Sequence, residues 1–276
     1  MLLDMRATQA LLGYLNTQID RITAGDVALR HGEDPIHDTR VAIRRLRSTL
    51  RVFGKLFDES ASGDLDNELT WYAALLGDVR DCQVQLRRFS DALDAMPDQL
   101  ILGPVRARIR NDLQAVELPA RTQLSEAMDS ERYAALMAVL RQWRTRPPVD
   151  QDITTQALKR RARRAQRKAD RRLSSALQSG DDALLHRARK AAKRARYAGE
   201  LCRPVSKRAK RTIKYYKHIQ TLLGDHQDTV VATEALRRMA VSAGTTLGEN
   251  GFTYGMLYAR EEQIARECRA DVLQFQ

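Results

Sequence analysis

The sequence predicts an all-α protein, and three observations support this fold class. Apolar residues recur at spacings of three and four residues through most of the 276-residue chain, which is the period of an amphipathic helix. The chain holds only 14 Gly and 7 Pro, and aromatic residues make up 5% of it, a composition typical of helical proteins rather than sandwiches, barrels or disordered chains. No alternation of apolar and polar residues indicates a strand.

The expected helices are separated by recognisable breaks. Asp34 is a candidate N-cap for a helix that has Pro35 in its first turn. Turn-forming residues and proline pairs predict breaks at 60–63, 146–150, 180–181 and 203–204. We expect helices from Met5 into the twenties and then over about 35–57, 64–77, 79–95, 98–116, 130–145, 152–178, 182–202, 206–223, 226–242 and 253–273.

Positive charge is concentrated in the second half of the chain. Lys and Arg number 47 against 35 Asp and Glu, a net charge of +12. Residues 1–150 hold 20 basic and 22 acidic residues, whereas residues 151–276 hold 27 and 13. The segment 156–217 alone holds 22 basic and 4 acidic residues. Such a balance favours polyanionic partners such as nucleic acid, an anionic membrane or a phosphate polymer.

Cysteine use and hydropathy favour a cytoplasmic location. The three cysteines, Cys82, Cys202 and Cys268, are odd in number and widely scattered, which implies no disulfide framework. The apolar N-terminal stretch is interrupted by Asp4 and Arg6, so it does not resemble a signal peptide. No uncharged run approaches the roughly 18 residues of a membrane span, so we expect no membrane partner.

Two motifs recur in the same order in both halves. Residues 37–47 match residues 186–196 at an offset of 149, and residues 75–81 match residues 222–228 at an offset of 147. Two motifs at nearly the same spacing predict a tandem duplication, with repeats over 1–146 and 151–276. We therefore expect two helical bundles related by pseudo-symmetry.

The first motif places cations on one helix face. Positions i, i+3, i+7 and i+10 share a sector about 80° wide and extend over about 15 Å of helix. The first row consists of His37, Arg40, Arg44, Arg47 and Arg51, and the second row of His186, Arg189, Lys193 and Arg196. We expect no acidic partner for the row cations at i+3 or i+4, so that each row repels itself. A solvated surface would explain one such row, but two rows in register favour binding of a linear polyanion.

Further cations follow the second row. Lys207, Lys210, Lys214 and Lys217 repeat the same spacing, and Arg211 stands among them. The helix expected over 159–172 is also rich in arginine, and the sequence leaves open whether it lines the same groove or is a solvated face. Because charge is greater in the second half, we expect the second row to contribute more to affinity than the first.

The repeated aspartates allow two interpretations. They could be metal ligands, or they could anchor arginines of the rows, and we favour the second because no His, Cys and Asp cluster has ligand spacing. The residues are Asp78, Asp81, Asp225 and Asp228. No glycine-rich phosphate loop or nucleophile–base arrangement indicates catalysis, and no cofactor is implied.

These motifs resemble those of the conserved-histidine α-helical domain, CHAD. The resemblance rests on the two His/Arg/Lys rows and the Leu-Gly-Asp-x2-Asp segments, and it extends to the Gly-Phe-x2-Gly stretch at 251–255. It implies two pseudo-symmetric bundles with a basic groove that binds inorganic polyphosphate through the rows. The chain resembles a CHAD protein standing alone, since no Glu-x-Glu-x-Lys motif of a CYTH triphosphatase is found. One departure is that Asp64, Asp66 and Glu68 stand where the second half has Lys210, Arg211 and Lys214.

The leading functional hypothesis is therefore non-catalytic binding of polyphosphate. The alternative is a nucleic-acid-binding protein that uses the same basic surface, with nucleic acid otherwise a weaker competitor. An enzyme acting on phosphate chains is the third hypothesis, and it lacks carboxylate–metal machinery in the sequence. Polymer length, oligomeric state, protein partners and association with polyphosphate granules are left open.

Overall fold

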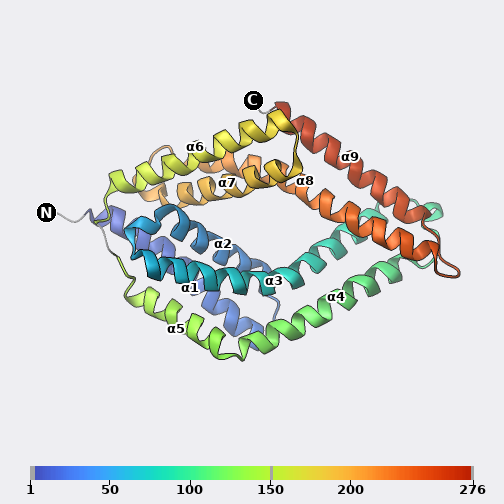
Figure 1. The fold of residues 1–276 in the computed structure, drawn as a ribbon, viewed down its shortest axis with the longest axis horizontal. Helices are drawn as coiled ribbons and strands as arrows, with labels where there is room; N and C mark the ends of the chain where they lie inside the picture. The colour runs from blue at the N-terminus through green and yellow to red at the C-terminus, as the bar shows by residue number, and fades with distance from the viewer. Residues whose placement is uncertain (1–3, 150–151, 275–276) are drawn as a thin grey trace. The chain divides into compact units, whose positions relative to one another are not determined.

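The computed structural model describes residues 4–149 and 152–274 and consists of helices joined by short turns (Figure 1). Within these residues the α-helices are α1 (Met5–Arg30), α2 (Ile36–Phe53), α3 (Glu59–Asp94), α4 (Val105–Met128), α5 (Glu131–Thr145), α6 (Thr155–Ser179), α7 (Asp182–Leu201), α8 (Ala209–Gly244) and α9 (Phe252–Gln274). Three single-turn 3-10 helices are η1 (Gly54–Leu56), η2 (Asp98–Leu100) and η3 (Arg203–Val205). The predicted all-α class is confirmed. None of the described helices is long and apolar enough to span a bilayer.

Two pairs of predicted helices are each one long helix. α3 and α8 are both 36 residues long, where the sequence predicted breaks near Gly77 and between 223 and 226. A glycine inside a helix costs about 1 kcal/mol relative to alanine, which is too little to end a helix held by packing along its length. The predicted turn at 60–63 is also wrong, since α3 begins at Glu59 and the Asp58 carboxylate accepts a hydrogen bond from the Ala61 amide at 2.7 Å.

Two other predicted boundaries differ from the structure. The N-cap position of α2 is Pro35 rather than Asp34, and no side chain caps this end by a hydrogen bond. The helix predicted over 98–116 begins later and ends later, at Val105 and Met128, and it continues through Pro119. Leu124 and Met128 beyond the proline are buried, so packing extends the helix past a residue that removes one backbone hydrogen bond.

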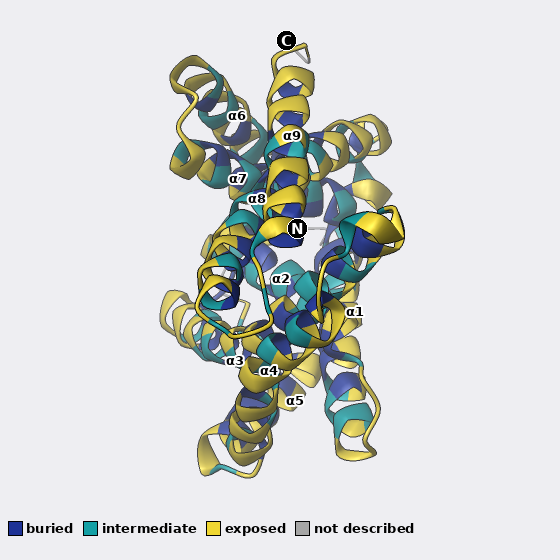
Figure 2. Ribbon diagram, turned by 90° about the vertical axis from the view of Figure 1, so that its right-hand side faces the viewer, coloured by how far each residue is buried: buried dark blue, intermediate teal, exposed yellow. Residues whose placement is uncertain are grey.

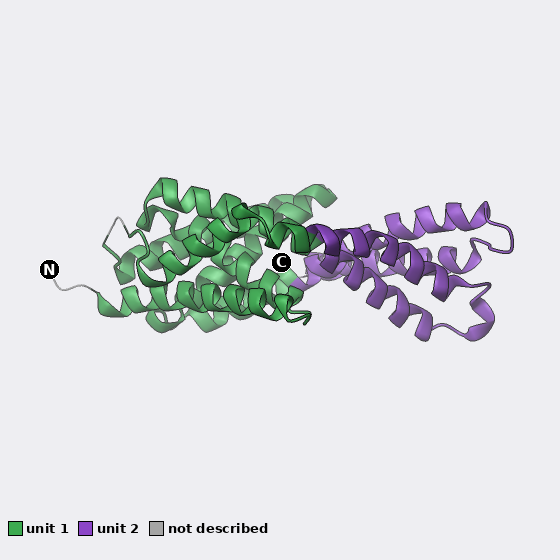
Figure 3. Cartoon of the chain, turned by 90° about the horizontal axis from the view of Figure 1, so that it is seen from below, with its two compact units in different colours: residues 1–77, 124–220 green, residues 78–123, 221–276 purple. Residues whose placement is uncertain are grey.

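The chain divides into two compact units (Figure 3). Unit 1 comprises residues 1–77 and 124–220, and unit 2 comprises residues 78–123 and 221–276. Each unit draws on both sequence halves, so the compact units do not coincide with the predicted repeats. The order of α-helices from α1 to α4, with a 3-10 turn after the second and a third of 36 residues, recurs from α6 to α9, although η2 between α3 and α4 has no described counterpart. A duplication predicts this order, and the duplication itself stays a prediction.

Each unit has its own apolar core, and its helices present buried and exposed faces (Figure 2). In unit 1, Phe57 packs on Trp143 with ring centroids 5.4 Å apart, and the Tyr72 and Tyr133 rings meet edge to face at 5.2 Å. The Tyr133 hydroxyl donates to Asp26 at 2.9 Å. In unit 2, residues of α3, α4, α8 and α9 form a buried cluster around Phe89, Leu236 and Tyr254.

Candidate functional site

The fold gathers the positive charge in unit 1. The residues of unit 1 include 35 Lys and Arg and 20 Asp and Glu, a net charge of +15, whereas unit 2 holds 12 and 15, a net of −3. The basic segment 156–217 lies wholly in unit 1, together with the first row. The two sequence halves, which differ in net charge, are therefore not the two compact units: the basic segment of the second half and the cationic first row lie in the same unit.

The two rows lie on neighbouring helices of unit 1. The first row is on α2 and the second row is on α7, and α2 packs against α7. α7 begins where the Asp181 carboxylate accepts a hydrogen bond from the Leu184 amide at 2.8 Å. His37 is exposed in the first turn of α2, and His186 is half-buried on α7. The structure thus makes neighbours of two helices whose rows are about 150 residues apart in sequence.

The first row faces α3. A Cβ atom on Gly77 would lie 2.6 Å from the Arg40 Nη1, so the missing side chain of this glycine makes room for the Arg40 guanidinium. Arg44 is half-buried, and its Nε is a buried donor with no hydrogen-bond partner in the described structure. Farther along α2, Arg47 and Arg51 both donate to the Asp66 carboxylate at 2.9 Å.

The second row has its own carboxylate. Arg196 donates to Glu200 at 3.0 Å and to Gln220 at 3.1 Å. The same Glu200 accepts from Arg45 of α2 at 2.9 Å and from the Tyr14 hydroxyl at 3.0 Å. Glu200 is 17% exposed, so this cluster is largely withdrawn from water.

The expected self-repulsion of the rows is wrong for these members. Asp66 reaches the first row from another helix, and Glu200 stands one turn beyond Arg196 on its own helix. Asp66 carries no local signal, because the packing of a separate helix contributes it. Glu200 stands four residues after Arg196, a spacing at which no acidic partner was expected. Arg40, Arg189 and Lys193 are half-buried, so the rows do not form a freely solvated face.

The third group of cations lies at the start of α8. Lys207 is in the turn that precedes the helix, and Lys210, Arg211 and Lys214 are exposed on its first turns. No salt bridge to any of these four residues is found among the described residues. Their charge is therefore available to a ligand in solution.

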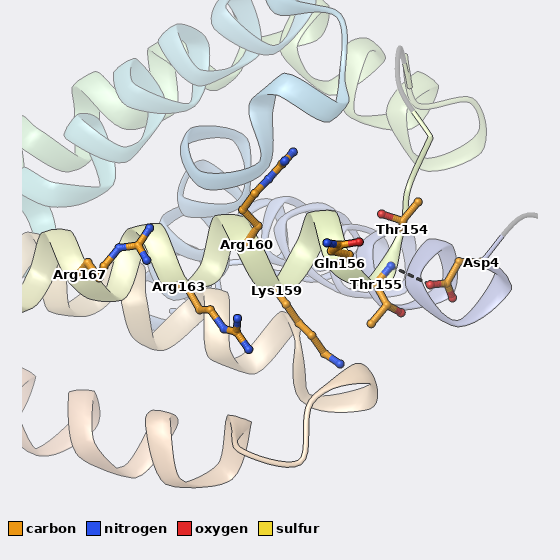
Figure 4. Close-up of a pocket in the computed structure, with 8 residues that line it drawn as sticks. All are labelled: Asp4, Thr154, Thr155, Gln156, Lys159, Arg160, Arg163 and Arg167. Atoms are coloured by element: carbon orange, nitrogen blue, oxygen red, sulfur yellow. Dashed lines mark hydrogen bonds between the residues drawn. The ribbon is translucent and has the colours of Figure 1, made fainter.

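Helix α6 lines two cavities that the sequence did not indicate. The smaller, of about 760 Å³, lies along its first turns beside Asp4, whose carboxylate accepts from the Thr155 amide at 2.7 Å. Figure 4 shows Lys159 and Arg163 extending from one side of α6 at this cavity. The larger, of about 1310 Å³, is lined by α6 together with parts of α2, η1, α3 and α7, and Arg51 of the first row lines it. Helix 159–172 is thus part of two basic hollows.

The repeated aspartates Asp78, Asp81, Asp225 and Asp228 belong to unit 2. Their role as anchors for the rows stays a prediction. Within the described residues, no group of three or more His, Cys, Asp or Glu side chains is placed to hold a metal ion. His226, beside Asp225, is buried and accepts a hydrogen bond from Arg269 Nε at 2.9 Å, which is a packing role.

Known structures share this fold over nearly the whole chain. PptA from Streptomyces chartreusis superposes with a TM-score of 0.80 at 21% identity, covering 97% of this chain and 98% of that one. The CHAD domain from the plant Ricinus communis superposes with a TM-score of 0.73 at 26% identity, covering 96% of this chain and 90% of that one.

Two sequence relatives match most of the chain. The uncharacterized proteins MT2285 and Rv2226, from two strains of Mycobacterium tuberculosis, are each 34% identical over 265 residues. That alignment covers 92% of this chain and 50% of the relatives, so the chain spans about half their length. The CHAD domain model matches residues 13–237, which include both rows and both Leu-Gly-Asp segments but end before the stretch at 251–255. The chain therefore belongs to the CHAD domain family.

Proposed function

We propose that this protein binds inorganic polyphosphate without turning it over, through the two rows and the cations at the start of α8. The observation that carries the proposal is the packing of α2 against α7, the two helices that carry the rows, in a unit of net charge +15. A row that extends over about 15 Å exceeds the size of one small anion. A flexible chain with one charge per phosphorus fits such a row.

The state of the arginines supports a phosphate ligand. Guanidinium groups bind phosphate through pairs of parallel hydrogen bonds. The buried Arg44 Nε has no hydrogen-bond partner among the described residues, and an unmade hydrogen bond of this kind costs about 1–3 kcal/mol. Phosphate bound by the rest of the Arg44 guanidinium would offset that cost. Asp66 and Glu200 hold neighbouring arginines in place, so the donors need little ordering on binding.

The same groups support binding without catalysis. The carboxylates beside the rows, Asp66 and Glu200, each accept hydrogen bonds from two arginines. They are therefore engaged as structural partners rather than held toward an attacking water.

Competition between polyanions tests the proposal. At near-physiological salt, long-chain polyphosphate should displace the protein from a labelled DNA duplex at lower phosphate concentration than unlabelled duplex does. Salt dependence alone does not discriminate, because both ligands release counterions. Equal or tighter binding of the duplex would refute the proposal and favour a nucleic-acid-binding protein.

A further inference from the structure

The larger cavity on α6, called the α6 cavity below, is unusually cationic. Nine of its nineteen lining residues are Lys or Arg, and three are Asp or Glu. Two of the acids are already engaged: Asp66 binds Arg47 and Arg51, and Asp170 accepts a hydrogen bond from the Tyr216 hydroxyl at 2.7 Å. The lining therefore carries a large surplus of positive charge around a hollow of about 1310 Å³.

Several of these cations are poorly accommodated in the free protein. Arg194 is half-buried, and no hydrogen bond or ion pair of its side chain is found in the described part of the chain. Burial, followed by the nearby Arg51 and Arg172, lowers the pKa of Arg194. Burial also lowers the pKa of Arg161, whose Nε is a buried donor with no hydrogen-bond partner in the described structure. Such groups are stabilised when an anion enters.

The position in the first half that aligns with Arg194 shows what this place lacks. The 149-residue offset aligns Arg194 with Arg45 and Arg51 with Glu200. At Arg45 the carboxylate of Glu200 is built in, and it accepts from Arg45 at 2.9 Å. At Arg194, the residue that takes the place of Glu200 is the cation Arg51, which lines the same cavity. The carboxylate that Arg45 receives from Glu200 therefore has no aligned counterpart here.

We propose that the α6 cavity is a second anion-binding site, which takes a short run of linked phosphate groups. Nine cations exceed what a single phosphate or a carboxylate ligand requires, and most of them are arginines, which favour phosphate oxygens. The phosphate class of the ligand rests on the proposed function, whereas the site rests on the cavity. Arg51 is common to the site and the first row, so one polymer can occupy both.

Tripolyphosphate is the probe that tests this site, with binding measured by isothermal titration calorimetry. Arg194→Gln should weaken its binding about tenfold, the effect of losing one charged hydrogen bond of about 1.5 kcal/mol. Lys168→Gln, at an exposed residue of the lining, should weaken it at least threefold. Arg141→Gln removes the same charge from the exposed face of α5 and should bind as wild type does.

Two outcomes overturn the site. Tripolyphosphate binding by Arg194→Gln and Lys168→Gln equal to that of Arg141→Gln would show that the cavity is not used. A melting temperature of ligand-free Arg194→Gln well below that of wild type would show that the protein itself satisfies this guanidinium. The expected melting temperature is equal or higher, because a half-buried cation is removed.

A row variant separates this proposal from the proposed function. Arg44→Gln lies outside the α6 cavity and should weaken long-chain polyphosphate while leaving tripolyphosphate binding within about twofold of wild type. If Arg194→Gln loses tripolyphosphate but Arg44→Gln keeps full affinity for the long chain, the cavity stands and the row function fails. The reverse pattern removes the cavity and leaves the rows.

Discussion

Replacing Glu200 with Gln should destabilise the folded protein more than removal of any exposed carboxylate. The side chain is 17% exposed and receives Arg45 at 2.9 Å, Arg196 at 3.0 Å and the Tyr14 hydroxyl at 3.0 Å. Removing one partner of a buried ion pair costs about 3–5 kcal/mol. The remaining exposure and the retained amide hydrogen bonds reduce this to about 2–3 kcal/mol, or about 5–10 °C in melting temperature.

A matched exposed pair provides the control for this experiment. Glu68 accepts two hydrogen bonds from Arg132, at 2.7 and 3.0 Å, but the two side chains are 35% and 51% exposed. Glu68→Gln should cost less than about 1 kcal/mol, the usual value for a surface ion pair. Chemical denaturation of both variants in phosphate-free buffer measures the difference. If Glu200→Gln loses no more stability than Glu68→Gln, burial of the Glu200 cluster is not what stabilises the contact between α2 and α7.

Four further outcomes follow from the structure. Gly77→Ala should weaken polyphosphate binding several-fold, because the new Cβ displaces the Arg40 guanidinium, and should leave the melting temperature nearly unchanged, because alanine favours the helix. Gly13→Ala, whose Cβ meets no atom within 4 Å, is the control in the same assay. The purified protein should release no phosphate from polyphosphate or nucleoside triphosphates, with or without divalent metal, in a colorimetric assay; turnover that is lost on Arg44→Ala would reveal an active site in the first row. Alanine at the three central cations of the first row and alanine at those of the second row should reduce polyphosphate affinity by factors that differ by less than about threefold, since both rows share the field of unit 1. Circular dichroism checks the fold, and a much larger loss from the second row would restore the expectation based on sequence halves. Burial raises the pKa of Cys202 to about 12 from 9.0, so the thiol ionises at lower pH in the unfolded chain, and the stability of the folded protein should fall as pH rises from 9.0 toward 12. If the denaturation midpoint of Cys202→Ala falls equally over this range, Cys202 is not the cause of the loss of stability.

The sequence alone determined the helical class, the rows and the charge surplus, because each is a local property. A period of 3.6 residues places the members of the first row on one face of α2 whatever surrounds that helix. The repeated motifs also identified the family, and the family match confirms that reading. Helix ends were less predictable, since Gly77 and Pro119 are local signals for a break that packing of the long helices overrides.

Tertiary structure alone decided which charges are paired across helices. Asp66 meets Arg47 from 19 residues away and Glu200 meets Arg45 from 155 residues away, and no local pattern predicts contacts between separate helices. The same packing places the second-half basic segment in one compact unit with the first row, although the sequence halves they come from differ greatly in net charge. It also gives Arg45 the carboxylate of Glu200, whereas no ion pair of the aligned Arg194 is found in the described part of the chain. An ion pair between helices depends on the distance between two side chains in space. In this chain each compact unit contains helices from both sequence halves, so those distances are fixed only when the helices pack.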